Sequence, residues 1–95
     1  MHFTADTETG SYIDDPSEDQ VRDLVSGLGH AAGTFITLTP ASEDQDWYAS
    51  VSLLPDGTTE IDRGDPARGE QHTAPTTDGP DSIASDLTTW IAARN

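Results

Sequence analysis

The 95-residue chain contains no cysteine and no lysine. Without cysteine it has no disulfide, no Cys-ligated zinc and no thiol nucleophile. The first ten residues, MHFTADTETG, contain neither a basic region nor an apolar run, so no signal peptide is expected. No apolar stretch approaches the roughly 20 residues that a membrane-spanning helix requires. Together these absences predict a soluble, cytoplasmic protein.

Positive charge is scarce. Four arginines stand against 13 aspartates and 5 glutamates, which gives a formal net charge of -14. Nucleic acid and anionic membranes are poor partners for such a chain, because their phosphates carry the same sign. A basic protein is the partner that this charge favours. Salt-adapted and high-GC proteomes also contain acidic, lysine-free chains, so composition alone is an alternative explanation.

Motifs for catalysis and for metal binding are missing as well. The chain has no G-x-S-x-G, P-loop or G-x-G-x-x-G sequence. Its three histidines, His2, His30 and His72, include no pair with the i, i+4 spacing of a helical zinc site. An EF-hand register that begins at Asp6 fails after Gly10. We therefore expect no enzyme activity, no cofactor and no metal, with weak surface binding of cations as the alternative.

Two amphipathic helices are predicted. For the first, Asp15 is the expected N-cap and Pro16 is the expected first helical residue. Glu18 completes a capping-box-like pattern with Asp15. Gly27 and Gly29 are the expected stop signals. The acids from residue 14 to residue 23 are interpreted as the solvated face of this helix.

The second helix is expected after the turn DGPDS. Asp81 or Ser82 is the predicted cap. Arg94 would lie near its C-terminal end, where the helix dipole favours a cation.

Alternating apolar residues predict three strands, at residues 34–39, 46–54 and 58–63, joined as a meander. Shorter strands are expected near residues 2–5 and 11–14. Residues 64–80 are predicted to form a long surface loop, with a short edge strand near 70–74 as an alternative. The whole chain, 1–95, is predicted to be one α+β domain. It consists of a three- to five-stranded antiparallel meander with two helices packed on one face. The predicted core contains Val21, Leu24, Val25, Leu28, Ile36, Leu38, Trp47, Val51, Leu53, Ile61, Ile83, Leu87, Trp90 and Ile91.

One candidate binding site follows from the alternation in residues 46–54. Tyr48 falls on the sheet face opposite Trp47, so Tyr48 and Phe35 are exposed if the helices cover only one face. Tyrosine is a common interface anchor, and the neighbouring acids Glu43, Asp44 and Asp46 would select a basic partner. A singly exposed tyrosine with no partner is the alternative. Arg63 and Arg68 flank the acidic sequence GDPA, where local ion pairs are expected.

The order of segments also resembles a known family. DDPSEDQVRDLVSGL is followed by TFITLT, WYASVSLL, PDGTTEI, GDP and TTWI. This order resembles the small immunity proteins of bacterial polymorphic-toxin systems, especially the deaminase-associated group. The resemblance implies an intracellular, non-enzymatic α+β protein that binds a toxin domain and blocks its active site. It also implies toxin-facing acids near SEDQDWY and EIDRGDP, which adds Glu60, Asp62 and Asp65 to the candidate site.

Two functions of different classes remain. One is an immunity or inhibitor protein that masks a basic partner, with an oligomeric state that the sequence does not specify. The other is an acidic accessory domain whose charge maintains solubility and attracts no partner.

The charge imbalance leads to a first prediction. Mutual repulsion of the acids destabilises the compact state, and salt screens that repulsion. We expect the thermal unfolding midpoint to rise between low salt and about 1 M NaCl. A midpoint that does not move would contradict this expectation.

Overall fold

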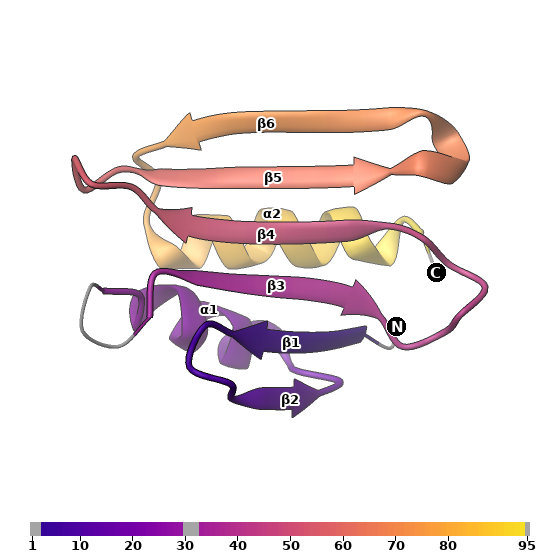
Figure 1. Cartoon of the computed structure of the whole chain (residues 1–95), viewed down its shortest axis with the longest axis horizontal. Helices are drawn as coiled ribbons and strands as arrows, with labels where there is room; N and C mark the ends of the chain where they lie inside the picture. The colour runs from indigo at the N-terminus through magenta and orange to yellow at the C-terminus, as the bar shows by residue number, and fades with distance from the viewer. Residues whose placement is uncertain (1–2, 30–32, 95) are drawn as a thin grey trace.

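The structure is a computed structural model that describes residues 3–29 and 33–94. Six strands form one sheet in the order β2-β1-β3-β4-β5-β6, and every neighbouring pair is antiparallel (Figure 1). The strands are β1 Phe3–Thr7, β2 Tyr12–Asp14, β3 Phe35–Pro40, β4 Tyr48–Leu53, β5 Thr59–Asp65 and β6 Glu70–Thr76. The helices are α1 Glu18–Ser26, the short 3₁₀ helix η1 Pro66–Arg68, and α2 Pro80–Ala92.

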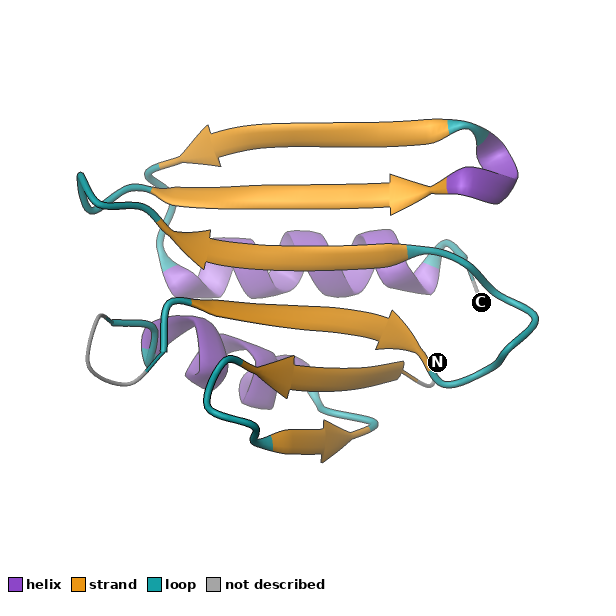
Figure 2. Ribbon diagram, in the orientation of Figure 1, coloured by secondary structure: helices purple, strands orange, loops and turns teal. Residues whose placement is uncertain are grey.

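Helices α1 and α2 lie on the same face of the sheet and contact each other (Figure 2). The chain first forms the β1–β2 hairpin and then crosses this face as α1. It next enters β3 beside β1, and β3 to β6 follow as a meander. This confirms the predicted α+β class with two helices on one face, although the sheet has six strands rather than three to five. In the described part of the chain, no helix is long and apolar enough to cross a membrane.

The edge strand expected near residues 70–74 is confirmed as β6, but the long surface loop predicted around it at residues 64–80 is wrong. Strand β5 continues to Asp65, η1 turns the chain, and β6 returns along the full length of β5. Gly69 makes this return possible, because its φ of 66° lies in the left-handed region that glycine adopts without strain. Glycine, proline and threonine in this segment therefore build a hairpin rather than an open loop.

The start of α1 also differs from the prediction. Ser17 is the N-cap, and its side chain forms a capping box with Gln20 rather than the expected pair of Asp15 and Glu18. Asp15 has a φ of 51°, so it belongs to the turn before the helix, and Pro16 is buried in that turn. Gly27 is the C-cap, as predicted.

In α2 the N-cap is Gly79 and Pro80 occupies the first turn, so neither Asp81 nor Ser82 caps the helix. Proline suits this position because its missing N–H would have no helical partner. A side-chain hydrogen bond joins the two helices: Thr88 Oγ1 donates to Glu18 Oε1 over 2.9 Å.

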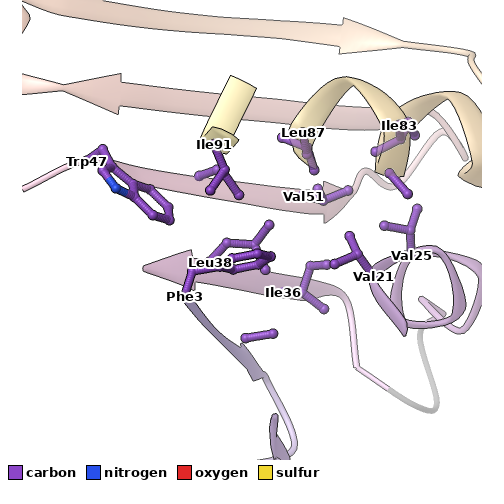
Figure 3. Packing of buried hydrophobic residues seen from close by; sticks show 13 residues of the cluster. Phe3, Val21, Val25, Ile36, Leu38, Trp47, Val51, Ile83, Leu87 and Ile91 are labelled. Carbon is purple, nitrogen blue, oxygen red and sulfur yellow. The ribbon is translucent and has the colours of Figure 1, made fainter. Parts of the chain in front are cut away.

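The hydrophobic core lies between the helices and the sheet (Figure 3). Its buried members are Phe3, Ala5, Val21, Val25, Ile36, Leu38, Trp47, Ala49, Val51, Ile83, Ala84, Leu87 and Ile91. Phe3 and the three alanines were not predicted. Leu24, Leu28, Ile61 and Trp90 pack against the core but stay partly exposed, and Leu53 does not belong to the described cluster. Trp47 links the layers, since its ring meets Phe3 and Trp90 edge-on at centroid distances of 6.3 and 6.0 Å.

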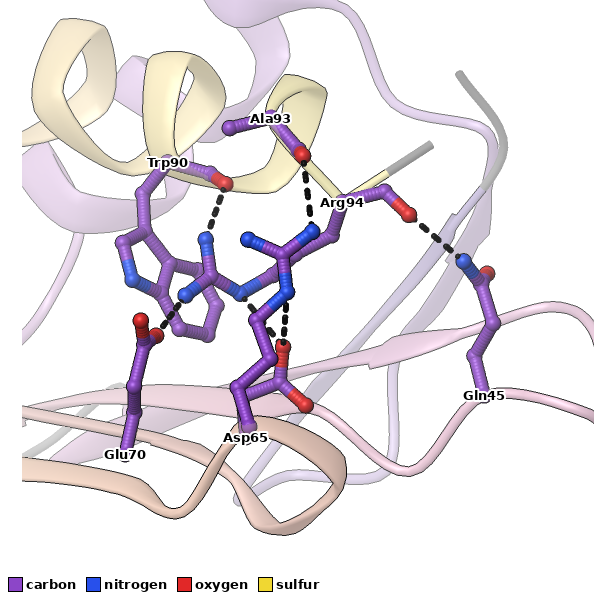
Figure 4. A network of polar contacts seen from close by, with 7 residues as sticks. Gln45, Asp65, Glu70, Trp90, Ala93 and Arg94 are labelled. Carbon is purple, nitrogen blue, oxygen red and sulfur yellow. Dashed lines mark hydrogen bonds and ion pairs between the residues drawn. The ribbon is translucent and has the colours of Figure 1, made fainter.

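Arg94 ties the end of α2 to the β5–β6 hairpin (Figure 4). Its side chain is only 5% exposed, and its Nε lies 3.0 Å from Oδ2 of Asp65, which is 7% exposed. The guanidinium also pairs with Glu70, lies 3.6 Å above the centroid of the Trp90 ring, and donates from Nη1 to the Trp90 carbonyl oxygen over 2.9 Å. Arg94 thus lies at the helix end where a cation was expected, and it is held by three kinds of contact.

Loss of this buried cation should be costly, because Asp65 would be left charged and without its main partner. We expect Arg94→Ala to lower the free energy of unfolding by about 3–5 kcal/mol in urea titrations.

Arg22 provides the matched control. Its ion pairs with Asp19, Asp23 and Asp81 are all solvent-exposed, so Arg22→Ala should cost about 1 kcal/mol or less. Equal losses in the two variants would contradict a structural role for the Arg94 contacts.

Candidate functional site: the open face of the sheet

The sheet face opposite the helices carries no helix and is called the open face here (Figure 1). Strand register and alternation identify its side chains. Its central row, from β2 to β6, contains Tyr12, Asp6, Thr37, Ser50, Asp62 and Thr73. The rows on either side add Asp14, Thr4, Thr39, Tyr48, Gly64 and Gln71, and Phe35, Ser52, Glu60 and Pro75.

Short hydroxyl side chains make up much of this face, and their hydrogen bonds hold it in one arrangement. Thr4 Oγ1 and Thr39 Oγ1 lie 3.1 Å apart across the β1–β3 pair. Thr73 Oγ1 donates to Oδ1 of Asp62 over 2.9 Å across the β5–β6 pair. The open face is thus a flat polar platform.

Among the described residues, all charged side chains on the open face are acidic. Four acids contribute to it, Asp6, Asp14, Glu60 and Asp62, whereas the chain has no lysine at all. All four arginines lie elsewhere: one in α1, one on the helix-side face of β5, one in η1 and one directly after α2. A positively charged surface would therefore meet no repulsive side chain on this platform.

Tyr48 lies flat over Gly64 on the neighbouring strand. A Cβ atom placed on Gly64 would come within 2.3–2.5 Å of two ring carbons and the hydroxyl oxygen of Tyr48. The two residues are direct cross-strand partners, and the ring keeps Gly64 buried while Tyr48 itself stays half-buried. Only glycine leaves room for the Tyr48 ring at this position, so Gly64 allows the ring to pack against the sheet.

Two more aromatic side chains stand on the open face. Tyr12 on β2 is 60% exposed and Phe35 at the start of β3 is 40% exposed. With Tyr48 they surround the hydroxyl-rich centre of the platform. Sequence analysis placed Tyr48 and Phe35 on this face, but it did not connect Tyr12, Asp6 or Asp14 with them. The pairing of β1 with β2 and β3 brings these residues onto the platform.

The seven predicted binding residues fall into three places. Tyr48, Glu60 and Asp62 share the open face. Glu43, Asp44 and Asp46 are exposed in the loop between β3 and β4, at one end of the sheet. Asp65 is buried on the helix side and pairs with Arg94 and with Arg68, so its carboxylate serves the C-terminal contacts described above.

Two carboxylates outside the open face have shifted pKa values. Hydrogen bonds from the Thr34 backbone N–H and side chain lower the pKa of Glu8, at 2.7 and 2.8 Å. Hydrogen bonds from the Thr58 side chain and backbone lower the pKa of Asp56. Asp56 stabilises the turn between β4 and β5, whereas Glu8 ties the segment after β1 to the residue before β3. Among the described residues, no group of three or more histidines and acids could hold a metal ion.

Comparisons with known protein families, with curated proteins and with solved structures find no match to this chain. The open face is therefore interpreted from its own geometry and charge.

Replacing Gly64 tests the packing of Tyr48. Gly64→Ala would force the Tyr48 ring off the strand, and overpacking of this kind costs about 1–3 kcal/mol of unfolding free energy. The loss should shrink when Gly64→Ala is combined with Tyr48→Ala, because the small side chain leaves room for the new methyl group. Urea unfolding of the two single variants and the double variant measures this coupling, and additive losses would contradict the stacked arrangement.

Proposed function

We propose that this chain is a non-enzymatic binding protein that uses its open face to bind and mask a basic partner protein. The observation that carries the proposal is that four acids and three aromatic side chains share a sheet face on which the described residues place no arginine. Interfaces favour aromatic anchors at their centres, and complementary charge steers the partner and accelerates association.

Within this class, an immunity or inhibitor protein fits best. Such a protein must cover a toxin domain, and an uncovered six-stranded sheet face offers a broad, rigid surface for that purpose. The support comes from the order of segments DDPSEDQVRDLVSGL to TTWI, which resembles deaminase-associated immunity proteins, and from the acidic open face. The acidic β3–β4 loop, Glu43 to Asp46, would extend the contact beyond one end of the sheet.

Charge reversal separates the open face from overall charge. We expect the triple variant Asp6→Lys, Glu60→Lys and Tyr48→Ala to bind the partner at least about tenfold more weakly. A control variant, Asp19→Lys with Asp23→Lys, changes the net charge equally but alters the exposed surface of α1. The control should retain most of the affinity, and circular dichroism should show that both variants stay folded.

To find the partner, the tagged chain is used to capture proteins from a lysate of its own cells. The product of the neighbouring reading frame is also tested for binding. A basic protein that binds at low salt, dissociates near 1 M NaCl and no longer binds the open-face variant agrees with the proposal. Equal loss in the α1 control would show that net charge, not the open face, determines binding. No partner at low salt, with strong stabilisation by salt, would instead support the acidic accessory domain.

A further inference from the structure

A second uncovered region lies on the helix side of the sheet, between α2 and the edge strand β6. Behind the sheet, α2 follows β4, and no helix lies behind β6 (Figure 1). Two adjoining pockets of about 190 and 430 Å³ occupy this region, and Arg63 and His72 line both of them. We call this region the β6 groove.

Arg63 differs from the other arginines. Arg22, Arg68 and Arg94 each have a carboxylate within 4 Å, as the ion pairs with Asp19, Asp65 and Glu70 show. None of the 18 acids, all of which lie in the described residues, forms such a pair with Arg63. The local ion pair that the sequence suggested at this position is therefore not present.

The guanidinium of Arg63 contacts His72 and Trp90. Its Nη2 lies 3.5 Å from Nδ1 of His72, and its Cζ lies 5.9 Å from the centroid of the Trp90 ring. Its Nε is buried without a hydrogen-bond partner in the described structure, as is the Nε of Arg94. A guanidinium presents its donors in a planar fork that matches a carboxylate. Because no acid of the chain pairs with Arg63, its outer nitrogens can serve as donors for one carboxylate.

The pocket beside Arg63 is apolar at its base. Ile61 and Ala74 contribute from the sheet, and Ile83 and Leu87 contribute from α2. Its volume of about 190 Å³ suits one aliphatic side chain, whereas the adjoining pocket of about 430 Å³ is lined mostly by polar residues. Asp78 and Asp86 also line this pocket, and Glu70 lines the adjoining one, so these acids disfavour a bound anion the more charges it carries, phosphate more than a single carboxylate.

Strand β6 is the last strand of the sheet, and its outer edge has no strand partner among the described residues. It is also seven residues long, whereas the opposite edge strand β2 has three. An exposed edge strand can pair with an extended peptide, whose alternate side chains then enter neighbouring pockets.

We propose that the β6 groove binds the C-terminal end of a protein chain whose last residue is aliphatic. The peptide would pair with the edge of β6, its last side chain would enter the apolar pocket, and its terminal carboxylate would bind the Arg63 guanidinium. A single carboxylate matches the single unpaired arginine. This inference does not depend on the open face, which lies on the other side of the sheet.

The test uses a pair of acetylated pentapeptides that end in Val-Leu, one with a free carboxylate and one with a carboxamide. They are added to the full ¹⁵N-labelled chain at about 1 mM in low salt. We expect the acid peptide to shift the Arg63 Nε–H signal and the β6 amide signals. The carboxamide should bind at least about tenfold more weakly.

Arg63→Gln should remove the preference for the acid, and Arg22→Gln, which alters only exposed ion pairs, should keep it. If Arg63→Gln does not fold, Ala74→Leu serves instead, because the larger side chain fills the pocket and should abolish binding. Equal binding of both peptides, no shifts with either, equal shifts with inorganic phosphate, or unchanged binding to a folded Arg63 or Ala74 variant would overturn the proposal.

Discussion

The structure depends on one constraint: only the two helices α1 and α2 cover the six-stranded sheet, and both lie on the same face. Apolar side chains can be buried only where those helices reach, so the core forms one layer beneath α1 and α2. The other face must accept water, which is why threonine, serine and acids occupy its centre. The helices are also too few to cover β6, which leaves the groove beside Arg63. The open face and the β6 groove are thus two consequences of the same shortage of helical cover.

The few contacts that cross between layers gain importance in so thin a core. Arg94 joins α2 to the β5–β6 hairpin through Asp65, Glu70 and Trp90. Thr88 and Glu18 join the helices to each other. These bonds hold the helices to each other and to the β5–β6 hairpin without using acids of the open face. A partner could therefore occupy Asp62 and Tyr48 without breaking an ion pair that the fold requires.

Sequence periodicity predicted what depends on local pattern. The apolar spacing from Val21 to Leu28 and the alternation from Trp47 to Val51 identified α1 and the buried side of β4. Partners distant in sequence were harder to predict. Phe3 and Ala5 appear ordinary until β1 pairs with β3, and the same pairing brings Asp6 onto the open face beside Thr37. Asp65 looked like a surface acid because its neighbours are polar, yet Arg94, 29 positions later, buries it. Arg63 was expected to pair locally, but alternation turns it to the opposite face from Asp62.

Hydroxyl-radical footprinting of side chains tests the central claim most directly, because it compares the two faces in one experiment. In the free chain, Tyr12 and Phe35 should be oxidised readily, whereas Phe3 and Trp47 should be protected by the core. In the complex with the basic partner, Tyr12, Phe35 and Tyr48 should become protected together. Protection of Tyr12 and Phe35 in the free chain would show that the face is covered. A footprint confined to the helices in the complex would show that binding uses another surface.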